Sequence, residues 1–309
     1  METKVYRKRK KIRKNILTLY AMMIPGFIYI FINNYMPLPG LAIAFKRFDY
    51  SKGIWDSPWT GLSNFTYLFK SQDALNMVRN TLGYNLVFII LGNVIAVAVA
   101  VMLNFLKGKM NKKVYQTLIL MPYLVSTVVV SYIVYAFLGQ ESGFLNSLLV
   151  SMGKDKISWY TSPKYWPYIL TIVFIWKNFG YSSILYYAAV IGIDSSLYEA
   201  AMVDGAGRMR QVWHVTLPGL KNTIITMVLL QIGKMFYSDF GLFYQVPMRS
   251  GLITSVTDTI DVFVYRNLSM LNDIGRASAA GFLQSMLGFA LILAVNFIVR
   301  RVDRDSALF

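Results

Sequence analysis

The sequence predicts an all-helical membrane protein that crosses the bilayer six times. Of its 309 residues, 56% are hydrophobic and only 15% are charged, and the mean hydropathy is positive. Soluble domains are less apolar, and a run of about 20 apolar residues is enough to cross the hydrocarbon core. Six such runs occur, and each is expected to be a helix because a helix satisfies its own backbone hydrogen bonds in lipid.

Pro25 and Pro122 lie inside the first and third apolar runs, where we expect them to kink the helix without ending it. The spans and their loops are predicted to form one membrane domain over residues 1–309, and the loop between the third and fourth spans is short. The six predicted spans are Ile16–Met36, Leu82–Phe105, Val114–Leu138, Trp166–Ile193, Asn222–Phe240 and Ala280–Val299.

The basic residues predict on which side each loop lies. Six spans put both termini on one side, together with the loops that follow the second and fourth spans. That side carries 18 lysines and arginines, eight of them in the first 14 positions, whereas the other side carries 11 spread over longer loops. Because such residues accumulate in cytoplasmic loops, we expect a basic cytoplasmic tail at 1–15 and a cytoplasmic loop at 194–218. The tail is expected to contact anionic membrane lipid, and nucleic acid is not an expected partner.

The composition argues against an enzyme. The chain has no cysteine and a single histidine, His214, which removes thiolate chemistry and makes a zinc site improbable. It contains neither a Gly-x-x-x-x-Gly-Lys phosphate loop nor a Gly-x-Gly-x-x-Gly fingerprint, and no catalytic residues are predicted. If the protein uses ATP, another chain must bind it.

The polar stretch 198–218 between two apolar runs predicts a helix, a turn and a second helix. Ser196 and Glu199 have the spacing of a capping box at a helix start. Gly205 and Gly207 permit a sharp turn, and the helical pattern resumes over Arg208–Val215. Such a unit on a membrane surface suits docking into a groove of another protein.

This stretch resembles the EAA loop of ATP-binding-cassette (ABC) importer permeases. Glu-Ala-Ala is followed after three residues by glycine, after nine more by an aliphatic residue, and after one more by Leu-Pro; only valine at 215 replaces the commoner isoleucine. The resemblance implies the type I ABC importer permease fold, with a cytoplasmic coupling helix in a cleft of a cytoplasmic ATPase. The residues implied in coupling are Glu199, Ala200, Ala201, Asp204, Gly205, Ala206, Leu217 and Pro218.

A second block, beginning at Pro37-x-x-Gly40 and ending at Asn64-Phe65, is similar to polysaccharide or lipoprotein-type carbohydrate permeases of the maltose-importer class. That resemblance implies a bacterial cytoplasmic membrane and an oligosaccharide substrate. The implied partners are a second homologous permease, two ATPase subunits that hold ATP and magnesium, and an extracytoplasmic binding protein. The alternatives are an ABC permease for another solute, such as glycerol phosphate, and a stand-alone secondary carrier.

Charged residues inside spans are costly and mark candidate transport sites. Lys177 lies at mid-depth of the fourth predicted span, and Lys234 lies in the fifth. Aromatic rings can stack on sugar rings, and amide and amino groups can bond sugar hydroxyls. In the alternative interpretation each lysine pairs with an acid such as Asp239. The residues predicted to line a substrate path are Tyr123, Trp176, Lys177, Asn178, Tyr181 and Lys234.

Overall fold

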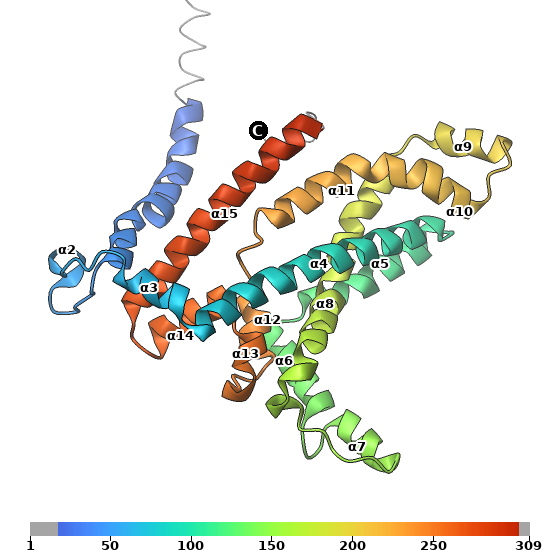
Figure 1. Cartoon of the computed structure of the whole chain (residues 1–309). Helices are drawn as coiled ribbons and strands as arrows, with labels where there is room; N and C mark the ends of the chain where they lie inside the picture. The colour runs from blue at the N-terminus through green and yellow to red at the C-terminus, as the bar shows by residue number, and fades with distance from the viewer. Residues whose placement is uncertain (1–17, 303–309) are drawn as a thin grey trace, which may run out of the picture.

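The computed structural model describes residues 18–302, which form long helices joined by short helical and irregular segments (Figure 1). Over this range the only extended pairings are two isolated bridges, Lys46 with Trp59 and Asp49 with Gly53. The predicted basic tail at 1–15 lies outside the described residues. The all-helical class is therefore as predicted.

Five helical segments of the described chain are long and apolar enough to cross a membrane, and a bent pair makes a sixth candidate. The pair consists of α5 (Lys109–Leu124) and α6 (Thr127–Leu138). Six candidate spans thus agree with the six apolar runs, although most helices extend beyond the predicted limits. The other five are Thr18–Phe45, Gln72–Phe105 (α4), Pro163–Ile191, Arg208–Ile232 and Ile274–Arg301.

The third predicted span is not a kinked continuous helix, and that prediction is wrong. The axes of α5 and α6 differ by 91°. Val125 and Ser126 between them have extended backbones, with ψ angles of 130° and 140°. Pro122 lies inside α5 and is followed by two further helical residues, so the proline itself is not the end of the helix. The break is held by contacts from distant parts of the chain, described below.

The fifth predicted span ends earlier than expected. Its helix α11 (Leu217–Ile232) stops at Gly233, and residues 233–239 form turns and irregular structure before the short helix α12 (Phe240–Gln245). The Asp239 side chain accepts a hydrogen bond from the Leu242 amide and caps α12. Helix α11 thus ends before Gly233, and Phe240 begins a new helix, so the predicted end of the span at Phe240 is wrong.

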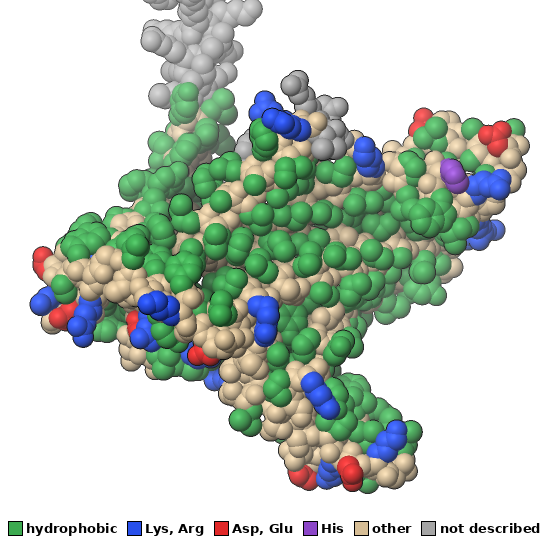
Figure 2. All heavy atoms as spheres, viewed as in Figure 1, with side chains coloured by type: hydrophobic (Ala, Val, Ile, Leu, Met, Phe, Trp, Pro, Cys, Tyr) green, Lys and Arg blue, Asp and Glu red, His purple; other side chains and the backbone are tan. Residues whose placement is uncertain are grey.

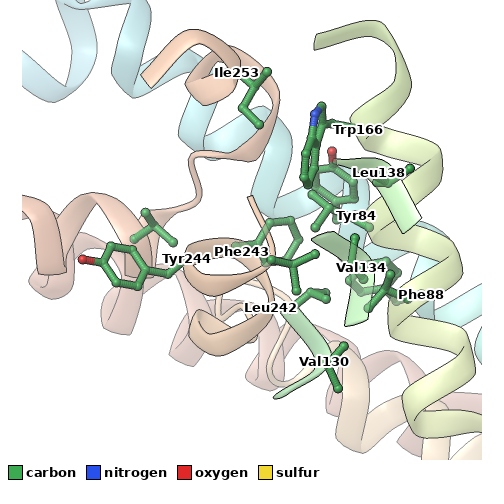
Figure 3. Packing of buried hydrophobic residues seen from close by; sticks show 14 residues of the cluster. Tyr84, Phe88, Val130, Val134, Leu138, Trp166, Leu242, Phe243, Tyr244 and Ile253 are labelled. Carbon is green, nitrogen blue, oxygen red and sulfur yellow. The ribbon is translucent and has the colours of Figure 1, made fainter. Parts of the chain in front are cut away.

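Helix α12 lies inside the largest buried cluster. Figure 3 shows its Leu242, Phe243 and Tyr244 among side chains of α4, α6 and α8 (Trp166–Ile191). The ring of Tyr84 lies 4.8 Å from that of Phe243 in an edge contact. Burial of these rings fixes the orientation of α12 against the long helices.

The remaining helices gather at the ends of the long ones (Figure 1). A second buried cluster joins the N-terminal segment to the start of α15 (Ile274–Val302), where the Phe45 and Phe282 rings lie 5.4 Å apart. The short helices are α2 (Gly53–Asp56), α3 (Ser63–Lys70), α7 (Phe144–Ser151), α9 (Ser195–Val203), α10 (Arg208–Gln211), α13 (Thr254–Thr257) and α14 (Ile260–Ser269).

The surface in Figure 2 is apolar over the long helices, whereas charged side chains gather toward their ends. The tip formed by α9 and α10 carries acidic and basic side chains. A broad apolar middle with charged ends is typical of a protein whose surface faces lipid.

Candidate functional site

A cavity of about 630 Å³ lies among α4, α5, α8, α11 and the irregular segment after α11. This size is within the range of ligand sites in proteins. Its wall is mainly apolar, but amide, hydroxyl and charged side chains interrupt it. The polar members are Asn85, Asn93, Tyr123, Asn178, Tyr181, Ser182, Tyr186, Gln231, Lys234, Tyr237, Ser238 and Asp239.

Two tyrosines form a flat aromatic part of the wall. The rings of Tyr123, in the last turn of α5, and Tyr181, on α8, are stacked with centroids 4.7 Å apart and planes 12° apart. Their side chains are also among the exposed large ones, at 40% and 45%. A stacked pair with accessible ring surface can contact the apolar face of a ring-shaped ligand.

Amide side chains join the helices behind this wall. The Asn93 amide donates to the Gln231 side-chain oxygen at 2.7 Å, which links α4 to α11. The Tyr186 hydroxyl donates to the Asn93 side-chain oxygen, which links α8 to both. The Asn85 amide donates to the carbonyls of Met235 and Tyr237 and so holds the irregular segment in place. In lipid such polar groups need partners, and these bonds provide them.

The structure brings together four of the six residues predicted for a substrate path. Tyr123, Asn178, Tyr181 and Lys234 line the cavity. Lys234 lies in the turn after α11 and not inside a helix, contrary to the sequence prediction, because α11 ends before it. Trp176, which is 40% exposed, lies outside the cavity.

Lys177 also lies outside the cavity. Its ammonium donates to the Val125 carbonyl at 3.1 Å and to the Thr127 hydroxyl at 2.8 Å. The alternative of pairing with Asp239 is not found either, because none of the ion pairs between described residues involves Lys177, Lys234 or Asp239. Lys177 is therefore bound to the break in the third span.

The loop 194–218 has the predicted form of a helix, a turn and a second helix. Gly205 takes the left-handed φ of +74°, which glycine adopts at low cost, whereas Gly207 has an ordinary φ of −65°. Helix α9 precedes the turn, and α10 continues through a π-helical segment, Val212–Thr216, into α11. Glycine is thus required by the backbone at 205 and not at 207.

The start of α9 differs from the predicted capping box. Asp194 is the N-cap, and its carboxylate accepts from the Ser196 amide at 2.9 Å. This backbone hydrogen bond, together with the Ser196 side chain, lowers the pKa of Asp194 below its usual value. Ser196 itself is therefore inside the helix and its predicted capping role is wrong.

Two side-chain contacts close the loop. The Gln211 amide donates to the Ala206 carbonyl at 2.9 Å, and the Tyr198 and Thr216 hydroxyls are 3.0 Å apart. Both contacts tie the α9 side of the turn to the α10 side. Several large apolar side chains of this small unit remain exposed, namely Leu197, Met202, Val203, Met209 and Trp213.

Sequence reasoning overlooked the amides Asn93 and Gln231, which lie in apolar runs just as the two lysines do. Polar side chains at membrane depth are costly whether or not they carry charge, and that signal would have singled them out. No group of three or more potential metal ligands occurs among residues 18–302.

Comparison with known proteins gives one family and several long matches. Residues 92–305 match the model of the family described as "Binding-protein-dependent transport system inner membrane component". Protein LplB of Bacillus subtilis is 33% identical over 93% of this chain and 90% of its own length. The polygalacturonan/rhamnogalacturonan transport system permease protein YteP of the same organism is 30% identical over 97% of this chain and 94% of its own length.

The chain is also similar to a solved structure, a bacterial ABC transporter involved in the import of the acidic polysaccharide alginate. The TM-score is 0.85 and the identity 30%, over 96% of this chain and 99% of the other. A second structure of the alginate transporter, in complex with alginate pentasaccharide-bound periplasmic protein, gives a TM-score of 0.84 at 29% identity, over 95% and 97% of the two chains.

Proposed function

The chain belongs to the family of binding-protein-dependent transport system inner membrane components, and on this premise we propose that it is the permease of an ATP-driven importer of an oligosaccharide or polysaccharide fragment. Membership makes it a transport subunit of a membrane and not an enzyme. It also gives no support to the stand-alone secondary carrier, because family members work with a binding protein.

The observation that carries the carbohydrate proposal is the cavity with its stacked tyrosines and amide side chains. A sugar ring has weakly apolar faces that can lie against Tyr123 and Tyr181. Its hydroxyls both donate and accept, which suits amides such as Asn178 that also do both. The names of relatives that import polygalacturonan, rhamnogalacturonan or alginate support the same class of cargo.

The rest of the importer is proposed from the family. A second, homologous permease would pair with this chain. Two ATPase subunits would hold ATP and magnesium, and an extracytoplasmic binding protein would deliver the glycan, as the periplasmic protein in the alginate complex suggests. We place the chain in the bacterial cytoplasmic membrane as one domain, with both termini in the cytoplasm and the tail on anionic lipid.

The loop 194–218 is proposed to dock in the ATPase. Its exposed apolar side chains, such as Val203 at 88% and Met209 at 70%, would become buried in that contact. Gly205 gives the turn that sets α9 against α10, and Glu199, Ala200 and Ala201 lie in α9 before that turn. Movement of the docked loop as the ATPase closes would then rock the long helices and open the cavity to the other side.

The cargo can be tested in the reconstituted importer with a panel of neutral and acidic oligosaccharides and glycerol phosphate. We expect at least one oligosaccharide bound by the binding protein to stimulate ATP hydrolysis and to be taken up. Tyr181→Ala should lower that uptake about tenfold. Ring stacking contributes on the order of 1 kcal/mol, and removal of the Tyr181 ring also leaves the sugar face in contact with water. Tyr168→Ala is the matched control, because Tyr168 is on the same helix, is 72% exposed and lies outside the cavity.

Two outcomes would contradict the carbohydrate proposal. One is stimulation by glycerol phosphate or another solute with none by any glycan. The other is equal uptake in Tyr181→Ala and in its control, which would remove the tyrosine wall from the path.

The coupling proposal is tested by two proline substitutions two residues apart. Proline has φ near −65°, so Gly207→Pro fits the backbone, whereas Gly205→Pro does not. Gly205→Pro is expected to insert normally but to lose the ATPase subunits or the stimulation of hydrolysis, while Gly207→Pro keeps both. Normal stimulation in Gly205→Pro would refute the coupling role.

A further inference from the structure

The break in the third span leaves polar backbone groups without helical partners. Helix α5 ends at Leu124, α6 begins at Thr127, and the two axes differ by 91°. The last carbonyls of one helix and the first amides of the next have no partner within their own helices. Inside a membrane, where water is scarce, each such group needs a partner from elsewhere in the protein.

Lys177, on the neighbouring helix α8, supplies donors to both sides of the break. Its ammonium bonds the Val125 carbonyl, between the helices, and the Thr127 hydroxyl, at the first residue of α6. Lysine has three N–H donors and no acceptor, so it suits a site rich in carbonyl and hydroxyl oxygens. Its side chain is only half-buried, and no described carboxylate forms an ion pair with it.

Two glycines bring the surrounding helices close to the same place. At Gly180, one turn after Lys177 on α8, an added Cβ would lie 2.5 Å from the carbonyl carbon of Ile119 on α5. At Gly241, in α12, an added Cβ would lie 3.2 Å from the Cβ of Thr127. Close packing on both sides makes the break a defined joint.

The joint borders the cavity. Tyr123 is two residues before Val125, and its ring stacks on Tyr181, which is one turn after Lys177 on α8. The bond from Lys177 to the Val125 carbonyl holds the end of α5 against α8, and with it the position of Tyr123 relative to Tyr181.

We propose that Lys177 is a positioning residue that caps the broken third span from a neighbouring helix and so places Tyr123 against Tyr181 in the cavity wall. The cap contacts no cargo. It rests on the geometry of the joint and not on the proposed carbohydrate, so its test needs no substrate.

The bend can be measured directly as a distance between two spin labels. The chain has no native cysteine, so cysteines introduced at Val114 and Ala136 would be the only labelled positions of this chain, and any cysteines of the partner subunits are to be replaced first. Both are exposed, one on α5 and one on α6. With a rise of 1.5 Å per residue, the two backbone sites are ~23 Å apart across a right-angle bend and ~33 Å apart in a straight helix.

The distance is measured by pulsed electron–electron double resonance on the full chain co-expressed with its partner subunits. The parent should give the shorter distance. Lys177→Met removes both bonds and should lower the ratio of bent to straightened molecules on the order of tenfold, as the loss of a charged hydrogen bond implies. Lys177→Arg keeps N–H donors and should restore the shorter distance. Methionine and arginine are both long side chains, so a difference between these two variants would come from the hydrogen bonds and not from side-chain size.

Two further variants keep the result decisive. Thr127→Val removes one of the two bonds at constant shape, and it should give a smaller shift in the same direction even if Lys177→Met fails to insert. Thr171→Val removes another hydrogen bond of α8, to the Pro167 carbonyl at 2.7 Å, and should change nothing. The proposal is overturned if Lys177→Met, or Thr127→Val in its place, gives the parent distances, or if Thr171→Val shifts them equally.

Discussion

Gly180→Ala tests whether α5 and α8 meet as closely as the structure requires. Gly180 is buried on α8, and a methyl group at this position would overlap the Ile119 carbonyl oxygen. It would also lie 2.5 Å from the Ile119 carbonyl carbon and 3.2 Å from the Leu120 nitrogen. All three atoms belong to the backbone of α5, so no rotation of a side chain can relieve the overlap.

The expected cost follows from that geometry. To restore an ordinary contact, α5 must move away from α8 by on the order of 1 Å, and inserting one carbon into a packed interface costs about 1–3 kcal/mol. Alanine has a better helix propensity than glycine by about 1 kcal/mol, which offsets part of this. Because the obstacle is backbone, we expect the upper end of the range, a net loss of about 2 kcal/mol.

The assay measures thermal unfolding of the purified permease. Samples are heated to a series of temperatures, and size-exclusion chromatography then gives the fraction that remains folded. Gly83→Ala is the matched control, since Gly83 lies within helix α4 and an added Cβ would meet nothing within 4 Å. We expect the midpoint to fall by several degrees in Gly180→Ala and to stay or rise slightly in Gly83→Ala. Equal midpoints for the two variants would refute the close approach of α5 and α8.

Burial raises the pKa of Asp258, between α13 and α14, to about 6, despite the Arg266 guanidinium 2.6 Å away. Because the folded pKa is above the unfolded value, its stabilising contribution is full below pH ~4 and is lost as pH rises through 6. Asp258→Asn should therefore raise the unfolding midpoint relative to the parent at pH 7.5 but not at pH 4, and a pH-independent difference would contradict this. Asn146 is fully buried, and its side chain forms hydrogen bonds with four residues of the loop 139–159, including Trp159. Asn146→Ala should therefore lower the free energy of unfolding by about 2–4 kcal/mol, measured by thermal unfolding. Asn111→Ala, at an exposed site with one local hydrogen bond, is the control and should lower it little.

The positions of the long helices could be predicted because they depend on local composition. An apolar run of sufficient length becomes a span wherever it occurs, so all six runs correspond to helical segments of the described chain. The turn at Gly205 was likewise predictable, since glycine permits a backbone conformation that other residues resist. In both cases the physical cause lies within a few residues.

The break after Leu124 could not be predicted for the opposite reason. The groups that satisfy it belong to Lys177, about 50 residues further along the chain, and the group that packs on it is Gly241, more than 110 residues away. A local pattern limits the choices, and distant contacts make the selection.

The two lysines predicted at membrane depth illustrate how that selection decides function. A cation in a span is stable either beside a polar cavity or beside unpaired carbonyls, and the sequence around it does not distinguish the two. Lys177 has two bonds to the broken span and none to the cavity, whereas Lys234 lines the cavity with no ion pair to a described residue. Because Lys234 is left free to meet cargo, its removal should change which glycans are taken up, whereas removal of Lys177 should affect all of them alike.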